Sequence, residues 1–347
     1  MISINDRKES IKMLTTKRLF MVLLSIIMVS GMVMLSSCGK KTGSGDNADD
    51  AALLDYRIAD KSEGIVLLLS NDAYYDGLTQ NDLDFKMQKA GADLDEYKAF
   101  AEKQVIDYTD EQKAIIDKHM EYIKGLIEDR GYKLPPLEQI VFINTTMKEE
   151  CDAFAYTHGT HIFISGERMA KAEEEDSAYL DYIFAHEIFH CITRCNEDFR
   201  TKMYKIINFT TQEKDFDIPP SVKEYFISNP DVERHNSYAT FMIDGKPVDC
   251  FTAFVTKRHF EKEGDDFFDL GTTALVPVDG TDKYYLPEDA ENFDEVFGTN
   301  TDYVIDPEEC MADNFGFLIA YEMDGPEGKG YNNPEIITSI EDVLRNK

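Results

Sequence analysis

The residues best suited to chemistry stand close together in the stretch AHEIFH, at positions 185–190. His186 and His190 are four residues apart, and Glu187 directly follows the first histidine. Because positions i and i+4 of a helix share a face, both imidazoles can bind one metal ion. A catalytic zinc ion takes three protein ligands and leaves one position to water, whose proton Glu187 can accept as general base. The alternative is two core histidines and a glutamate that faces solvent.

A third ligand has to come from elsewhere in the chain, and the stretch DPEECMADNF at 306–315 offers one. Glu309 and Asp313 are four residues apart, so Glu309 can bind the metal while Asp313 accepts a hydrogen bond from the second nitrogen of a ligand histidine. Glu308 is rotated by about 100° from that face, and we expect Glu308→Ala to leave zinc affinity nearly unchanged. The alternative is an acidic helix start, which the helix dipole favours.

Together the two motifs resemble the gluzincin pattern of zinc peptidases, in which HExxH is followed later by ExxxD. Upstream, DAFAYTHGTHIFIS at 152–165 is similar to the layout of the endopeptidases related to the CAAX prenyl proteases. The resemblance covers roughly residues 137–195 and 305–320. It implies a zincin-like fold and one zinc ion bound by His186, His190 and Glu309. It also implies that the strand after Gly159 is an edge strand beside the active site, with which peptide or protein substrates pair.

The same resemblance implies a histidine or tyrosine that stabilises the oxyanion of the tetrahedral intermediate. His235 and Tyr238 are the candidates, because their segment lies between the two elements that carry the ligands. A surface loop is the alternative for this segment. His119 lies on the apolar stripe of another helix, and we expect it to be a hydrogen-bonded core histidine.

Local signals predict the elements that position these residues: a helix from a capping box at 109–112 to Gly131, a strand at 137–146, a hairpin at 152–165, a buried helix at 178–195 and a helix at 307–323. The apolar run GIVLLLS at 64–70 is typical of a buried strand, and 215–303 of loops with short strands. This order predicts an α+β fold. We expect a small mixed sheet whose edge strand lies beside the buried HExxH helix, and a further C-terminal ligand helix.

The N-terminus has the features of a bacterial lipoprotein signal. Two basic residues precede an apolar run at 19–35, and the stretch LSSC ends at Cys38. This resembles the lipobox, which implies a signal peptide at 1–37 and a lipid anchor on Cys38. A plain transmembrane anchor is the alternative. The polar stretch at 38–50 is expected to be a flexible tether, since it has too few apolar residues to pack.

The rest of the chain, 51–347, is expected to be one domain, with a helical part at about 51–134 and a catalytic part at about 135–347. The composition of the whole chain indicates which partners it does not bind. With 67 acidic and 36 basic residues the chain has a net charge of −31, which argues against binding to nucleic acid. Five cysteines follow Cys38 without a CxxC pair, so a structural zinc ribbon is not expected.

These features predict a membrane-anchored, zinc-dependent peptidase on the outer side of a bacterial membrane, in which a metal-bound water attacks the peptide bond. The alternative is a cell-surface binding lipoprotein that keeps the fold without turnover. The presence of Glu187 favours catalysis, because a protein that no longer catalyses has no need of the general base.

Overall fold

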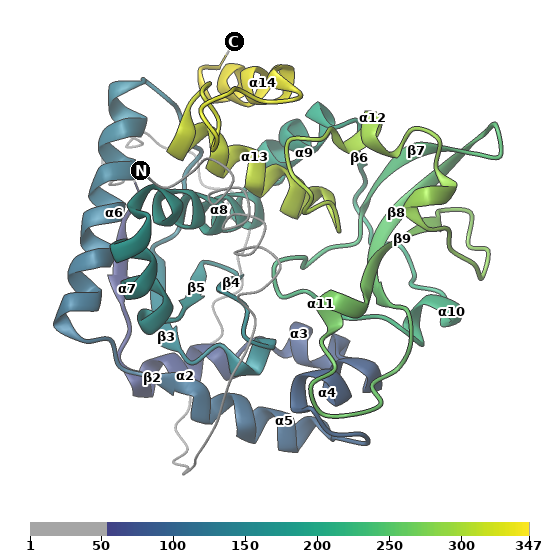
Figure 1. The fold of residues 1–347 in the computed structure, drawn as a ribbon, viewed down its shortest axis with the longest axis horizontal. Helices are drawn as coiled ribbons and strands as arrows, with labels where there is room; N and C mark the ends of the chain where they lie inside the picture. Colours follow the sequence, from purple (N-terminus) through teal and green to yellow (C-terminus); the bar gives the residue numbers. More distant parts are fainter. Residues whose placement is uncertain (1–53, 347) are drawn as a thin grey trace, which may run out of the picture.

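The fold combines α-helices with two separate β-sheets, as the computed structural model of the chain shows for residues 54–346 (Figure 1). The predicted signal peptide at 1–37, the lipidated Cys38 and the tether at 38–50 lie outside these residues. The α+β prediction is confirmed. Between residues 54 and 346, no helix is long and apolar enough to cross a membrane.

The elements follow one another in three stretches. The first contains β1 (Tyr56–Ile58), α2 (Lys61–Leu69), α3 (Asp72–Gly77), α4 (Gln80–Met87), α5 (Leu94–Ala101), η1 (Glu102–Gln104), β2 (Val105–Ile106) and α6 (Asp110–Asp129). The second contains β3 (Ile140–Thr145), η2 (Lys148–Glu150), β4 (Ala155–His158), β5 (His161–Ile164), α7 (Gly166–Glu175), α8 (Ser177–Cys195) and α9 (Glu197–Ile206). The third contains β6 (Thr210–Thr211), α10 (Pro220–Lys223), β7 (Ser237–Ile243), β8 (Lys246–Thr256), α11 (Phe267–Leu270), β9 (Gly271–Pro277), η3 (Pro287–Asp289), α12 (Phe293–Phe297), α13 (Pro307–Tyr321) and α14 (Pro334–Leu344).

The first sheet is mixed, in the order β1-β3-β5-β4, with β2 paired antiparallel to β3. Its centre is β3, which is buried at every position and pairs in parallel with β1 and β5. The predicted hairpin is β4 and β5, which pair antiparallel around a turn where Gly159 has a φ of 60°. The chain therefore leaves β4, the strand before Gly159, at the edge of the sheet. The family resemblance implied that the strand after the glycine, β5, would be the edge strand, and this expectation is wrong because β5 lies between β3 and β4.

The HExxH helix α8 lies between this sheet and α13 (Figure 1). Its residues from Ile183 to Thr193 are all buried, because apolar side chains surround the polar motif on every side. One core joins α6, α8, α13 and α14 to the inner face of the sheet. Helix α8 therefore fills the core and at the same time presents the polar side chains of the motif.

The second sheet is antiparallel, in the order β6-β7-β8-β9, and lies to the right of the helices in Figure 1. The sequence predicted only short strands here, whereas β8 runs for 11 residues and pairs along its length with β7 and β9. The buried strand expected at 64–70 is wrong, since this run belongs to helix α2. Asp60 begins that helix by accepting a hydrogen bond from the backbone N–H of Glu63, at 2.9 Å.

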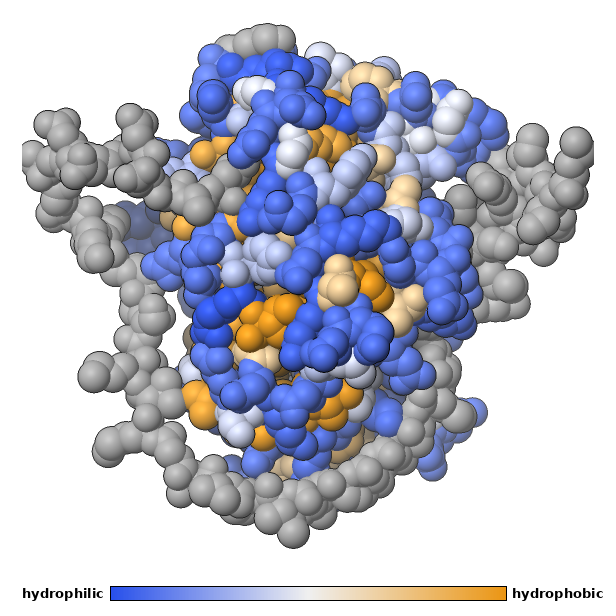
Figure 2. Space-filling view, turned by 90° about the vertical axis from the view of Figure 1, so that its left-hand side faces the viewer, coloured by the Kyte–Doolittle hydropathy of each residue, from blue (hydrophilic) through white to orange (hydrophobic). Residues whose placement is uncertain are grey.

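The surface reflects the acidic composition. The face in Figure 2 is mostly hydrophilic, with small and separate hydrophobic patches. Among the described residues the exposed large hydrophobic side chains are scattered along the chain, at Ile106, Tyr122, Phe268 and Met323. Single apolar residues of this kind are ordinary on protein surfaces.

Candidate metal centre

Helices α8 and α13 run antiparallel against each other and bring the two sequence motifs together. His190 meets Glu308, His186 meets Asp313 one turn further along, and Gly316 then lies against Tyr182. A Cβ atom at Gly316 would lie 2.9 Å from the backbone oxygen of Tyr182, so the absence of a side chain lets the two helices come this close. The local start of α13 is set by Pro307 and by Asp306, which caps the backbone N–H of Glu308.

Three side chains converge on one point between the helices. The Nε2 atom of His186 is 3.1 Å from Oε2 of Glu309, and Nε2 of His190 is 3.5 Å from the same oxygen. The ligand atoms of these three buried residues all lie within 4.8 Å of one another. The sequence prediction that His186, His190 and Glu309 come together agrees with this geometry.

The other nitrogen of each histidine is held by a carboxylate. Nδ1 of His186 lies 2.9 Å from Asp313, and Nδ1 of His190 lies 2.8 Å from Glu308. A bond at Nδ1 fixes the ring so that Nε2 faces the shared point, which is the usual support for a metal-binding histidine. Asp313 lies where the sequence predicted. Glu308 was expected to lie off the face that meets the histidines, whereas the structure places it against Nδ1 of His190.

The carboxylates next to the histidines are themselves anchored by hydroxyl groups. Asp313 accepts hydrogen bonds from Tyr182, at 2.5 Å, and from Thr301. Glu308 accepts hydrogen bonds from Thr193, at 2.6 Å, and from Tyr204. Sequence reasoning missed these four hydroxyl residues, because they come from α8, from α9 and from the loop before α13, which only the fold brings to the two carboxylates.

The charges of the centre favour a cation. Burial opposes the protonation of His190, but the carboxylates of Asp231, Glu308 and Glu309 outweigh it and raise its pKa to about 10. Burial likewise opposes the ionisation of Glu309, yet the two neighbouring histidines lower its pKa. Carboxylates outnumber the histidines around this point, so a divalent ion can replace the protons that the histidines otherwise hold.

A metal ion fits this set of donors. Nε2 of His190 is buried without a hydrogen-bond partner in the described part of the chain, which is a costly state for a polar atom unless another group binds it. Two imidazole nitrogens and one carboxylate oxygen are donors that suit zinc. We conclude that His186, His190 and Glu309 could hold a metal ion.

Glu187 lies beside these residues and belongs to a second buried group, with His190 and Asp231. Its Oε2 accepts a hydrogen bond from the hydroxyl of Thr157 on the edge strand β4, at 2.7 Å. Only 4% of Glu187 is exposed, so the alternative of a glutamate that faces solvent is wrong. The carboxylate lies near His190, one of the three converging residues, and no Lys, Arg or His among residues 54–346 forms an ion pair with it.

The segment from Asn229 to Glu233 covers the edge of β4. Asp231 accepts a hydrogen bond from the backbone N–H of Thr157, at 2.7 Å, and Glu233 accepts one from Gly159, at 2.9 Å. Thr157 lies on the edge strand and Gly159 in the turn that follows it, so these carboxylates occupy donors at the edge of the sheet that a pairing peptide would use. At its start the segment contacts the centre itself, through the amide of Asn229 on Glu309.

The two residues predicted to stabilise an oxyanion lie elsewhere. The ring of His235 contacts Phe226 and Phe251, and that of Tyr238 contacts Phe216. In the part of the chain that the structure describes, neither residue makes a hydrogen bond or ring contact with the two histidines or with Glu309. Their position in sequence between the motifs did not bring them to the centre.

Tyr303 lies at the centre in their place. Its hydroxyl is 3.3 Å from Oε1 of Glu309, and its ring lies nearly parallel to that of His186 with the centroids 6.3 Å apart. Burial and the Glu309 carboxylate raise the pKa of Tyr303 well above its ordinary value, so the hydroxyl keeps its proton and remains a donor. Its place six residues before Glu309, just ahead of the helix start, is the only sequence signal that pointed to it.

Comparison with protein-family models, curated proteins and solved structures gives no significant match to this chain.

Proposed function

We propose that this protein is a zinc-dependent metallopeptidase of the gluzincin type, with a zincin-like fold. One observation carries the proposal: the Nε2 atoms of His186 and His190 converge on Glu309 while a carboxylate holds each Nδ1. A structural histidine pair would need no such arrangement, since one hydrogen bond for each ring would suffice to satisfy it.

When bound, zinc would polarise the substrate carbonyl and make a water molecule more acidic. The chain would supply the remaining groups. Glu187 would take the proton of the attacking water and later deliver it to the leaving amine. The hydrogen bond from Thr157 orients the Glu187 carboxylate, and Tyr303 would donate to the carbonyl oxygen as negative charge develops on it.

Peptide or protein substrates would add to an edge strand beside the site, and in this fold that strand is β4. Such a strand would have to displace Asp231 and Glu233 from the N–H groups of Thr157 and Gly159. This displacement is a conformational step that the proposed reaction requires before a substrate can bind.

The contacts of Asp231 and Glu233 with the edge strand also favour a second candidate, a binding lipoprotein that keeps the metal centre but does not hydrolyse peptides. In that protein the segment from Asn229 to Glu233 would remain on the edge strand, and no peptide would reach Glu187. The two candidates differ in one measurable respect, which is hydrolysis of a peptide in the presence of the metal.

The test compares wild-type protein with Glu187→Gln, loaded with zinc, on a mixture of unstructured peptides analysed by mass spectrometry. We expect the variant to bind zinc as tightly as wild type, because Glu187 is not one of the three ligands, and to lose hydrolysis by about 100-fold or more. Glu173→Gln serves as the control, because Glu173 pairs with His119 outside the centre. Equal hydrolysis by wild type and Glu187→Gln would contradict the mechanism, and no hydrolysis by zinc-loaded wild type would favour the binding protein.

The proposed location follows from Cys38, in the bacterial cell envelope with a lipid anchor to the membrane. Cys38→Ala should leave an unprocessed precursor without acyl chains. Mass spectrometry of the wild-type N-terminal peptide measures this directly, and an unmodified Cys38 would exclude the anchor.

A further inference from the structure

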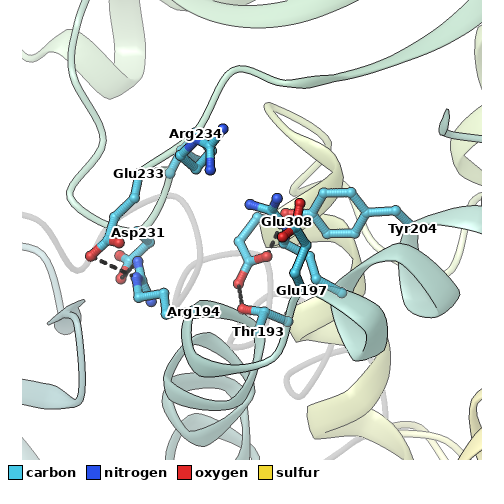
Figure 3. Close-up of a pocket in the computed structure, with 10 residues that line it drawn as sticks. Thr193, Arg194, Glu197, Tyr204, Asp231, Glu233, Arg234 and Glu308 are labelled. Carbon is cyan, nitrogen blue, oxygen red and sulfur yellow. Dashed lines mark hydrogen bonds and ion pairs between the residues drawn. The ribbon is translucent and has the colours of Figure 1, made fainter. Parts of the chain in front are cut away.

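A cavity of about 170 Å³ adjoins the metal centre on the side of His190. Its walls come from the last turns of α8, from α9 and from the segment 231–234, and Figure 3 shows Arg194 on one side and Tyr204 with Glu308 on the other. Two of the lining residues also flank His190, since Glu308 holds its Nδ1 and Asp231 lies 4.0 Å from its Nε2. A ligand in the cavity would therefore lie next to the proposed site of hydrolysis.

Most of the charges in the walls are neutralised within the protein. Arg194 lies beside Glu233 and Asp231 (Figure 3), at 2.9 Å and 4.0 Å. Arg234 is 2.8 Å from Asp215. Glu308 is used by the histidine and by two hydroxyl groups. These side chains leave no free charge with which to attract a ligand.

Arg200 is the exception. Only 7% of the residue is exposed, its Nε atom is buried without a hydrogen-bond acceptor, and no ion pair joins it to any of residues 54–346. Its nearest compensation is the ring of Tyr204, with 5.8 Å between the guanidinium carbon and the ring centroid. Glu197, one turn earlier on α9, is exposed and lies beyond ion-pair distance.

This state of Arg200 is unfavourable, because the Nε–H of a charged group is buried without a hydrogen-bond acceptor and the charge has no ion-pair partner. A carboxylate would restore the lost interactions through two parallel hydrogen bonds, which the planar fork of arginine suits. The carboxylates in the walls disfavour a doubly charged group such as phosphate, so one negative charge fits the cavity best.

We propose that this cavity is a specificity pocket in which Arg200 binds a carboxylate of the peptide substrate. The carboxylate belongs either to an Asp or Glu side chain or to the C-terminus of the peptide. This inference rests on the proposed peptidase function for the identity of its ligand, and on the unpaired guanidinium of Arg200 for the site itself.

The test measures binding without turnover, by calorimetry on metal-free protein and on the zinc-loaded Glu187→Gln variant. The probes are pairs of peptides that differ in one charge, either Asp against Asn and Glu against Gln at each position, or a free against an amidated C-terminus. We expect one member of these pairs to bind about 10- to 100-fold more tightly than its neutral partner. The pair that shows the preference identifies the source of the carboxylate.

Arg200→Gln should abolish this preference. Lys202→Gln is the matched control, because it removes an exposed positive charge from the same helix and should keep the preference. The Arg200 variant should fold with an unfolding temperature equal to or above that of wild type, since it removes a charge that lacks a partner. A loss of binding can thus be separated from a loss of structure.

Three results would overturn the inference: no preference in wild type, a preference that survives Arg200→Gln, or inorganic phosphate that competes better than acetate. Its failure can be told from failure of the peptidase proposal. Peptide hydrolysis without any carboxylate preference would refute only the pocket. A preference that depends on Arg200, in a protein that hydrolyses no peptide, would refute only the peptidase and leave a site for carboxylate ligands.

Discussion

The sharpest prediction concerns the two carboxylates behind the ligand histidines. Glu308→Gln and Asp313→Asn each keep the shape of the side chain and remove the charge that faces Nδ1 of one histidine. The rings keep a hydrogen-bond acceptor, but the charge that makes Nε2 a stronger donor to the metal is lost. We expect each variant to bind zinc about 10- to 100-fold more weakly, which corresponds to about 1.4–2.7 kcal/mol of binding free energy.

An alanine substitution at Glu308 is unsuitable for this test. Glu308→Ala would leave the hydroxyls of Thr193 and Tyr204 without their acceptor, and each buried hydroxyl left unpaired costs about 1–3 kcal/mol of unfolding free energy. The amide side chains preserve an acceptor for these groups. Thermal unfolding of the metal-free variants checks that any loss of zinc affinity does not come from partial unfolding.

Zinc affinity is measured by competition with a chromophoric chelator at constant pH. Asp181→Asn is the control, since Asp181 lies on the same helix α8 and holds Nδ1 of His119 at 2.6 Å, in a pair outside the metal centre. This control should keep the wild-type affinity. If Glu308→Gln also keeps it while Asp313→Asn loses it, the carboxylate of Glu308 does not support a ligand and the reasoning from geometry is refuted.

Three further predictions follow from the fold. Gly316→Ala should lower the unfolding free energy by about 1–3 kcal/mol in chemical denaturation, because its Cβ would lie 2.8 Å from the ring of Tyr182; an unchanged value would mean that the helices separate without cost. Burial raises the pKa of Glu149 to about 7, so its contribution to stability is complete below its unfolded pKa of about 4.3 and is lost as the pH rises through 7. Glu149→Gln should therefore gain stability relative to wild type between pH 4.5 and 8, by about 3 kcal/mol or less, and a difference independent of pH would contradict this. A bound, uncleaved peptide should slow backbone hydrogen exchange at 155–159 and speed it at 229–233, as exchange measured by mass spectrometry can show; the opposite pattern would exclude displacement of the segment.

Within the site, the sequence was sufficient to predict the relative positions of residues that lie on the same helix. His186, Glu187 and His190 are placed by the repeat of α8, and Glu309 and Asp313 by the repeat of α13. A helix fixes the relative direction of side chains four residues apart, so these pairs could be predicted without knowledge of the fold. The core role of His119, which pairs with two carboxylates, was predicted in the same way.

Relations between elements could not be predicted by the same reasoning. Glu308 was expected to point away because only its direction relative to Glu309 was known, whereas the antiparallel crossing of α13 on α8 places it against His190. Asp231, Tyr303 and Arg200 come from separate loops and from another helix, and nothing local in their surroundings distinguishes them.

For the fold, the sequence determined the class, the hairpin of β4 and β5, and the two helices that carry the motifs. It did not determine α2, because a short apolar run fits a buried strand and a buried helix equally well. It did not determine the long pairing of β7, β8 and β9 either, because strand partners are distant in the chain. Spacing along one helix is set by covalent geometry and hydrogen bonds between near neighbours. The rotation and approach of one helix on another are set by the packing of the whole core, and that packing decided which carboxylates face the histidines and which arginine was left without a partner.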